Sequence, residues 1–353
     1  MNHVQPLRAL LFSMEADALL LTSEISQRYA TGFPFSDGYV LITARDAYLL
    51  TDFRYTEEAE RSVDPEIRVE APTNFMEFLS DLFATERIRR VGYEDRAMTC
   101  AAFRELAERL SFEAVAIGEG IEKLRAVKDE EEILLIKRAQ EITDRAYSHI
   151  LSALTPNMTE NDVVLELEFF MRREGAEGIA FPSIAVSGAS SALPHGLPSG
   201  RRLSHGFLTM DFGAQVGGYC SDMTRTVVLG RATSEMRRLY KTVEEAQGLG
   251  MAAICEGVPA SLVDAAARSH IDSSGYRGLF GHSFGHGVGL EIHEAPRVGT
   301  RSRLPLQAGN VITAEPGIYR MGEYGCRIEN MGVVTACGFD SFTRSSTELI
   351  ELF

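Results

Sequence analysis

The chain has 353 residues, of which 45% are hydrophobic and 24% are charged, and its formal net charge is −15. This length is enough for two domains, and the composition is that of a soluble globular protein. The negative charge argues against nucleic acid or an anionic membrane surface as a partner, and five scattered cysteines without a C-x-x-C pair favour a reducing, cytoplasmic compartment.

The first 120 residues alternate between segments typical of strands and segments typical of helices. The apolar stretch at the start is interrupted by Glu15 and Asp17, and no apolar run reaches about 18 residues, so we expect neither a signal peptide nor a membrane span. Strands are predicted at residues 18–22, 90–93 and 114–117, and in a hairpin over 39–51. Helices are predicted at residues 75–83 and 103–110. Together they indicate an α/β unit with its own core.

The composition changes at residues 128–132, where a lysine precedes four acidic residues. This run begins a long amphipathic helix with one apolar stripe, formed by Leu135, Ala139, Ile142, Ala146 and Ile150. We therefore expect two domains, one of residues 1–122 and one of residues 123–353.

The second domain contains further helix and strand signals. Helices are predicted at residues 159–175, 234–249 and 260–271, and Thr159 with Asp162 resembles a capping box at the start of the first. Strands are predicted at residues 207–214, 219–229, 311–319 and 327–335.

Five potential metal ligands lie in these predicted strands or in a Gly-rich loop between them: Asp211, Asp222, His286, Glu315 and Glu329. An isolated carboxylate buried in such apolar surroundings costs several kcal/mol or more. Four converging carboxylates would repel one another, and two divalent cations would neutralise them. Two cations about 3.5–4 Å apart would also lower the pKa of one bridging water from about 15.7 towards about 7, which supplies hydroxide as a nucleophile. The pattern favours a dinuclear metal hydrolase; the alternative is unrelated carboxylates at strand ends.

Histidines recur in contexts rich in Gly and Pro, at His195, His282, His286 and His293. Glycines on both sides of His286 oppose a helix, so we expect an extended segment that passes close to a ligand. Residues 281–285 also match the G-x-S-x-G pattern of serine hydrolases. That alternative needs a helix after the serine and an acid before a downstream histidine, and the sequence offers neither.

These motifs resemble the family of creatinase, prolidase and aminopeptidase P, the pita-bread metallopeptidases. In the first domain the resemblance rests on residues 31–39 and 51–55. In the second it rests on residues 187–188, 194–196, 210–213, 219–226, 286–294, 315–319 and 327–329. The implied fold class is α/β (α+β), a small N-terminal creatinase-like α/β domain followed by a C-terminal pita-bread metallopeptidase domain.

The resemblance also implies a role for each residue of the site. Asp211 would chelate one metal, His286 and Glu315 would chelate the other, and Asp222 and Glu329 would bridge both. The implied catalytic residues are His195 and His293, which would contact the substrate, and His282, Tyr319 and Arg327, which match supporting positions. Carboxylates with one imidazole suit Mn²⁺, with Co²⁺, Zn²⁺ or Fe²⁺ as alternatives.

The implied activity is cleavage of the N-terminal Xaa-Pro bond of proline-containing peptides by a homodimeric, aminopeptidase P-like enzyme. A prolidase restricted to dipeptides is the first alternative, and it needs a closed site and a cation for the C-terminal carboxylate. Methionine aminopeptidase is a more distant alternative that the extra N-terminal domain opposes. A metal-free member, either a creatinase-type enzyme or a binding protein, is opposed by the presence of all five ligands.

Two positions depart from the family pattern. His205 stands where the family usually carries an acidic Gly-Asp pair, and we expect it to be a surface turn residue. Asn310 stands where methionine is frequent. Neither belongs to the ligand set, so we expect both to affect fine positioning alone.

Overall fold

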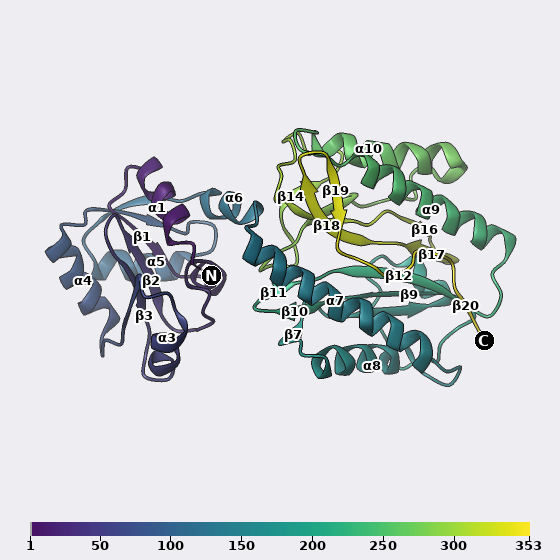
Figure 1. The fold of residues 1–353 in the computed structure, drawn as a ribbon, viewed down its shortest axis with the longest axis horizontal. Helices are drawn as coiled ribbons and strands as arrows, with labels where there is room; N and C mark the ends of the chain where they lie inside the picture. The colour runs from purple at the N-terminus through teal and green to yellow at the C-terminus, as the bar shows by residue number, and fades with distance from the viewer. Residues whose placement is uncertain (1) are drawn as a thin grey trace. The chain divides into compact units, whose positions relative to one another are not determined.

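The structure, a computed structural model, describes residues 2–353 and contains two compact units. One unit extends to Arg125 and the other is Ala126–Phe353 (Figure 1). The boundary predicted at residues 122/123 lies within helix α6 (Gly120–Ala126). Across the described residues, no helix is both long enough and apolar enough to cross a bilayer.

The N-terminal unit is a mixed six-stranded sheet with the strand order β4-β3-β2-β1-β5-β6. Its strands are β1 (Ala18–Leu21), β2 (Tyr39–Thr43), β3 (Ala47–Leu50), β4 (Ile67–Glu70), β5 (Arg90–Tyr93) and β6 (Glu113–Ala116). β1 pairs antiparallel with β2 and parallel with β5. Helices α4 (Phe75–Glu86) and α5 (Cys100–Arg109) bury Leu79, Phe83 and Leu106 against this sheet.

Helices α1 (Val4–Ser13), α2 (Glu24–Thr31) and α3 (Thr56–Ser62) of this unit were not predicted, and neither was α6 at its end. They are short, and helices of this length depend on tertiary contacts rather than on a long apolar stripe. In α2 the Ser23 side chain accepts a hydrogen bond from the Ser26 N–H, and Gly32 ends the helix with a φ of 70°.

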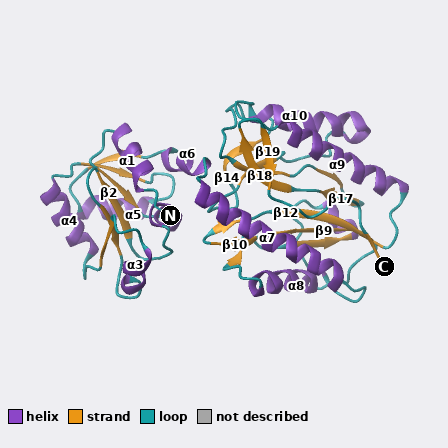
Figure 2. Ribbon diagram, in the orientation of Figure 1, coloured by secondary structure: helices purple, strands orange, loops and turns teal. Residues whose placement is uncertain are grey.

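The C-terminal unit contains the same arrangement of two helices packed on a sheet in each of its two halves. Helices α7 (Glu130–Ala153) and α8 (Glu160–Arg173) form one antiparallel pair, and α9 (Ser234–Ala253) and α10 (Ala260–Ile271) form another. The pairs lie on opposite sides of the strands (Figures 1 and 2). In both pairs the second helix begins seven residues after the first ends, at positions 100 residues apart. No repeat is visible in the sequence, because the two halves share the arrangement of elements and not the residues.

Each helix pair covers its own sheet and core. The first core joins α7 and α8 to a four-stranded sheet, through residues such as Ile142, Leu167 and Met210. The second joins α9 and α10 to a five-stranded sheet, through residues such as Val243 and Ile312. The predicted capping box of α8 is confirmed, because Thr159 and Asp162 each accept from the other's backbone N–H. A second capping box, of Asp129 and Glu132, begins α7.

The strands of this unit are short. In the first half they are β7 (Gly178–Ile179), β8 (Ile184–Ser187), β9 (Gly206–Phe212), β10 (Ala214–Val216), β11 (Tyr219–Cys220), β12 (Met223–Leu229) and the terminal β20 (Glu351–Leu352). In the second half they are β13 (Gly285–Gly287), β14 (Glu294–Val298), β15 (Val311–Ala314), β16 (Gly317–Arg320), β17 (Tyr324–Arg327), β18 (Asn330–Thr335) and β19 (Gly338–Ser341).

The prediction that the ligands lie within continuous strands was wrong for three of them. Asp222, Glu315 and Glu329 lie at breaks between successive strands. At two of these breaks the backbone bonds to another part of the unit: the Glu315 N–H donates to the Phe284 carbonyl and the Glu329 N–H to the Thr224 carbonyl. Proline at position 316 cannot donate to a ladder, which contributes to the first of these breaks.

Candidate metal centre

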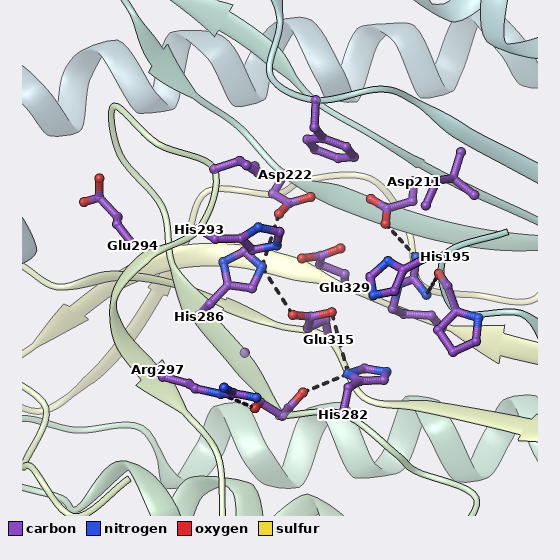
Figure 3. Close-up of a pocket in the computed structure, with 17 residues that line it drawn as sticks. His195, Asp211, Asp222, His282, His286, His293, Glu294, Arg297, Glu315 and Glu329 are labelled. Atoms are coloured by element: carbon purple, nitrogen blue, oxygen red, sulfur yellow. Dashed lines mark hydrogen bonds and ion pairs between the residues drawn. The ribbon is translucent and has the colours of Figure 1, made fainter. Parts of the chain in front are cut away.

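All five predicted ligands line one cavity of about 440 Å³, here called the metal cavity (Figure 3). They reach it from both halves of the C-terminal unit: Asp211 from β9, Asp222 from the break before β12, and the other three from the second half. His195, His282, His293 and Arg327 line the same cavity. Tyr319 contacts this group through hydrogen bonds and does not line the cavity itself.

Oxygen and nitrogen atoms converge at the centre of this cavity. Ligand atoms of Asp222, His286 and Glu329 lie within 4.8 Å of one another. The Nε2 atom of His286 is 3.3 Å from Glu315 Oε1 and 3.6 Å from Asp222 Oδ2. This spacing lets single cations contact side chains from both halves of the unit.

Burial and mutual repulsion disfavour the charged forms of these carboxylates. Asp222 is 4% exposed and Glu329 is 1% exposed. Burial, and then the neighbouring carboxylates, raise the pKa of Asp222 well above its ordinary range, and the pKa of Glu315 rises well above its range for the same reasons. Burial and the Asp211 carboxylate raise the pKa of Glu329 to about 8. The cluster therefore needs either protons or cations at neutral pH.

Histidine 286 has the protonation state that a metal ligand requires. Burial, and then the nearby His293, lower its pKa to about 4, so the ring is neutral at pH 7. Nδ1 lies 3.0 Å from the Gly287 carbonyl, which can only accept, so Nδ1 carries the proton and Nε2 has a lone pair. That lone pair faces the carboxylates of Asp222 and Glu315.

Glycine on each side of His286 allows this placement. A Cβ atom on Gly285 would overlap the Thr313 carbonyl of β15, and one on Gly287 would overlap the Ala295 carbonyl of β14. β13 therefore fits between β14 and β15 only with glycine at these two positions, as the sequence predicted for an extended, closely packed segment.

The residues present fit divalent cations. Asp211 Oδ1 and Glu329 Oε1 are buried and have no hydrogen-bond partner within residues 2–353. A buried acceptor without a donor is costly, and so is a nitrogen lone pair that faces carboxylate oxygens. Cations held by Asp211, Asp222, His286, Glu315 and Glu329 would satisfy all of these atoms. Such cations supply Lewis acidity and lower the pKa of a coordinated water.

Arg327 holds two of the carboxylates in place. Its side chain is 3% exposed, and its Nη2 donates to Asp211 Oδ2 at 2.6 Å. Its Nε donates to Thr224 Oγ1 at 2.9 Å, and Thr224 in turn donates to Glu329 Oε2 at 2.7 Å. One guanidinium therefore sets the positions of two carboxylates that are far apart in the sequence. It lies beside Asp211 as a buried cation rather than in a surface ion pair.

A chain of hydrogen bonds extends from Arg327 to His282. Arg327 Nη1 donates to the Tyr319 hydroxyl at 2.8 Å, and this hydroxyl lies 2.9 Å from His282 Nε2. His282 Nδ1 lies 2.9 Å from the Ser283 carbonyl and donates to it, so the tyrosine hydroxyl donates to Nε2. Burial, and then Arg327, lower the pKa of His282 to about 3. His282 is therefore a neutral, fixed element of the site.

His293 and His195 are the most solvent-accessible of the four histidines at the cavity. The His293 ring lies edge-on to the His286 ring, with 4.3 Å between ring centroids. Burial, and then His195, lower the pKa of His293. The Pro194 carbonyl beside His195 accepts from Arg327 Nη1 at 3.1 Å, which fixes the backbone of this loop.

Arg225 is a buried cation at the back of the site that the sequence did not single out. It is 0% exposed and donates to the carbonyls of Thr224, Glu329, Ser345 and Ser346 and to Asn330 Oδ1. It thereby joins the backbone of two site residues to the C-terminal segment.

Replacing Arg225 by methionine should destabilise the C-terminal unit by about 3 kcal/mol or more, because several buried carbonyls lose their donors. Lysine should recover part of this loss, since it keeps the charge without the planar fork. Thermal unfolding of the C-terminal unit would measure both effects. The exposed Arg231→Met is the control; equal stability of the two methionine variants would contradict the assignment.

Part of the cavity wall consists of residues that were not predicted as site residues. Phe181, Ile184, Ile292 and Arg297 line the cavity, as does Glu294. The Lys128 ammonium pairs with Glu294 at 2.6 Å, and both side chains are buried, so Glu294 is occupied by this ion pair. Arg297 lies in β14, four residues after His293, and this proximity in sequence was the available signal for it.

Comparisons with known proteins identify the family of this chain. Residues 135–336 match the sequence family "Metallopeptidase family M24", and residues 3–127 match "Creatinase/Prolidase N-terminal domain". The chain is 40% identical over 351 residues to the "Uncharacterized peptidase YqhT" of Bacillus subtilis, which covers 99% of both chains.

Two solved structures have the same fold over nearly the whole chain. The Xaa-Pro dipeptidase from Bacillus anthracis has a TM-score of 0.95 and 39% identity, over 99% of both chains. The X-Pro aminopeptidase from Thermotoga maritima has a TM-score of 0.93 and 35% identity, over 98% of this chain and 100% of that one. The predicted fold class is confirmed, and the chain belongs to metallopeptidase family M24, with an N-terminal domain of the creatinase/prolidase type.

Proposed function

We propose that this protein is a dinuclear metal-dependent exopeptidase that hydrolyses the N-terminal Xaa-Pro bond of peptides. One observation carries the proposal: five metal-ligand side chains meet neutral imidazoles and an apolar wall in a single cavity. The names of the similar structures, Xaa-Pro dipeptidase and X-Pro aminopeptidase, support the same bond specificity. Carboxylate ligands with one imidazole make Mn²⁺ the first metal to test.

The wall of the metal cavity suits proline. Phe181, Ile184 and Ile292 supply apolar surface beside the ligands. The tertiary Xaa-Pro amide has no N–H, so it can lie against apolar side chains without leaving a buried donor unsatisfied. A secondary amide in the same position would lose a hydrogen bond to water.

The histidines at the cavity supply hydrogen bonds and proton transfer. His293, neutral at pH 7 because burial lowers its pKa, donates to the carbonyl oxygen as negative charge develops there. His195 lines the same cavity and would act on the leaving-group side, where an imidazole can pass a proton to the proline nitrogen. His282, Tyr319 and Arg327 act as positioning residues, because their hydrogen bonds fix Asp211.

The position of Arg297 supports the proposal that dipeptides are substrates as well as longer peptides. It lines the metal cavity, its Nε donates to Ser283 Oγ at 2.8 Å, and no carboxylate pairs with it within the described chain. A dipeptide places its C-terminal carboxylate directly beside the proline ring, where this guanidinium can bind it. Arg297 also lines a second, neighbouring cavity, which supports the aminopeptidase P-like activity on longer peptides.

Arg297→Gln should raise KM for an Xaa-Pro dipeptide about tenfold, because a neutral amide cannot form the charge-assisted pair. The effect on kcat should be smaller. Steady-state kinetics on the dipeptide and on its C-terminal amide measure the change. Wild type should prefer the free acid to the amide, and the variant should not. A wild-type enzyme that does not distinguish acid from amide would rule out this role for Arg297.

The proposed function is tested by turnover of the Mn²⁺-loaded protein on an Xaa-Pro dipeptide, an Xaa-Pro-Xaa tripeptide and an Xaa-Ala dipeptide, with and without EDTA. We expect both proline peptides to be cleaved, the alanine peptide to be cleaved at least about tenfold more slowly, and EDTA to stop all cleavage. Preferential cleavage of the alanine dipeptide, with Met as its first residue, would favour methionine aminopeptidase. Cleavage of none of these would refute the proposal.

A further inference from the structure

A second cavity of about 410 Å³ adjoins the metal cavity, and we name it the arginine cavity. The two cavities share His282, Ser283 and Arg297 as lining residues, and Figure 3 shows His282 and Arg297 at the edge of the metal cavity. The remaining wall includes Arg268 and the turn of residues 299–302. A peptide that continues beyond a proline bound near Arg297 would enter this space.

The arginine cavity has a positive lining in a strongly negative chain. Arg268, Arg297 and Arg301 line it, and no aspartate or glutamate does so among the described residues, although the net charge of the chain is −15. Arg268 is used within the fold: it pairs with Asp264 and donates to the Phe280 and His282 carbonyls. The charge available to a ligand is therefore that of Arg297 and Arg301.

Arg301 stands on a turn that is fixed to the site. The Ser302 N–H donates to the Gly299 carbonyl at 2.9 Å, and the Ser261 N–H at the start of α10 donates to the Ser302 carbonyl at 2.9 Å. A Cβ on Gly299 would lie 2.7 Å from Ser283 Oγ, so the turn packs directly on the serine that accepts from Arg297. Arg301 itself is exposed and has no ion-pair partner within residues 2–353.

We propose that the arginine cavity binds a carboxylate of the substrate beyond the proline, and that Arg301 is the residue that recognises it. This inference rests on the proposed Xaa-Pro activity and extends it to longer peptides. Each residue of an extended peptide adds about 3.3–3.6 Å, so a tripeptide places its C-terminal carboxylate one residue past the position served by Arg297. The ligand is this terminal carboxylate or an acidic side chain at the third residue.

The test compares kcat/KM for an Xaa-Pro-Xaa tripeptide with a free C-terminus and for its C-terminal amide, using the whole Mn²⁺-loaded enzyme. Wild type should prefer the acid, and Arg301→Gln should reduce the acid-to-amide ratio about three- to tenfold, mainly through KM. Arg303→Gln is the matched control, because this substitution removes the same charge. Arg303 is exposed, lies two residues from Arg301 and lines neither cavity. The control variant should leave the ratio unchanged.

A second pair of substrates separates the two sources of carboxylate. Tripeptide amides with Glu or Gln at the third position have no terminal charge, so a preference for Glu that Arg301→Gln removes would assign the cavity to acidic side chains. Equal ratios in wild type and both variants, or cleavage of dipeptides alone, would overturn the inference and leave the Xaa-Pro activity intact. Absence of cleavage of any Xaa-Pro substrate would overturn the proposed function and this inference with it.

Discussion

Asp222→Asn and Glu329→Gln should each remove bound metal and turnover together. These two carboxylates are the most deeply buried of the ligand set, and the resemblance to the pita-bread metallopeptidases implies that they would bridge both cations. An amide of the same shape has one oxygen and no charge, so it cannot bridge. We expect kcat/KM on an Xaa-Pro peptide to fall about a thousandfold or more, and metal content to fall below one ion per chain.

Metal analysis of the dialysed protein, with kinetics on the same sample, checks this result. Asp81→Asn is the control, because Asp81 is exposed on α4 in the other unit. Thermal unfolding of the metal-free proteins tests whether the variant folds. The metal-free Asp222→Asn protein should unfold at a temperature no lower than that of metal-free wild type, because the substitution removes a carboxylate that its neighbours repel. Full activity in either variant would refute the bridging assignment, and lost activity with metal retained would assign the residue to chemistry instead.

Much of the fold followed from local patterns in the sequence. The helix predicted at residues 260–271 has those bounds in α10, and the capping box of Thr159 forms as predicted, because apolar spacing and caps act within a few residues. The breaks in the strands at the ligands could not be predicted in this way. Glu329 leaves its ladder because its N–H donates to the carbonyl of Thr224, 105 residues earlier in the chain, and no local signal reports such a contact.

The site residues that were predicted from the sequence are those that belong to recognisable motifs. All five ligand candidates and four of the five catalytic candidates line one cavity, whereas their roles remain predictions. Arg297, Arg301 and Arg225 were missed for physical reasons. Arg301 lies in a turn, where no periodicity marks it, and Arg297 lies in the short strand β14, whose pattern does not distinguish it. The hydrogen bonds of Arg225 depend on the C-terminal segment, about 120 residues away along the chain.

The same buried charges predict how the metal-free protein responds to pH. Glu329 has a pKa of about 8 in the folded protein against an ordinary value of 4.5, because of burial and the Asp211 carboxylate. A group whose pKa is raised by folding binds more protons in the folded state, so folding becomes more favourable as the pH falls from about 8 towards 4.5. The raised pKa values of Asp222 and Glu315 act in the same direction.

Two histidines oppose this trend at lower pH. The pKa values of His282 and His286 are lowered to about 3 and about 4 in the folded protein, from an ordinary value of 6.5. Below about pH 6.5 the unfolded chain therefore binds additional protons at these two histidines, which offsets part of the stabilisation that the three carboxylates provide. The stability of the metal-free protein should consequently rise most steeply as the pH falls from 8 to 6.5, and change less below that range.

Metal binding should reverse the slope between pH 8 and 6.5. Cations require deprotonated carboxylates, so the loaded protein should lose stability as protons compete for the site. Thermal unfolding with EDTA and with Mn²⁺ across this range measures both slopes, and we expect the metal-free midpoint at pH 6.5 to exceed that at pH 8 by roughly 5 °C. The metal-free Asp222→Asn protein should show a smaller rise, because one of the repelled carboxylates is gone. A metal-free wild type that becomes more stable from pH 6.5 to 8 would mean that these carboxylates do not share a buried cluster, and the cation site inferred from them would fail with it.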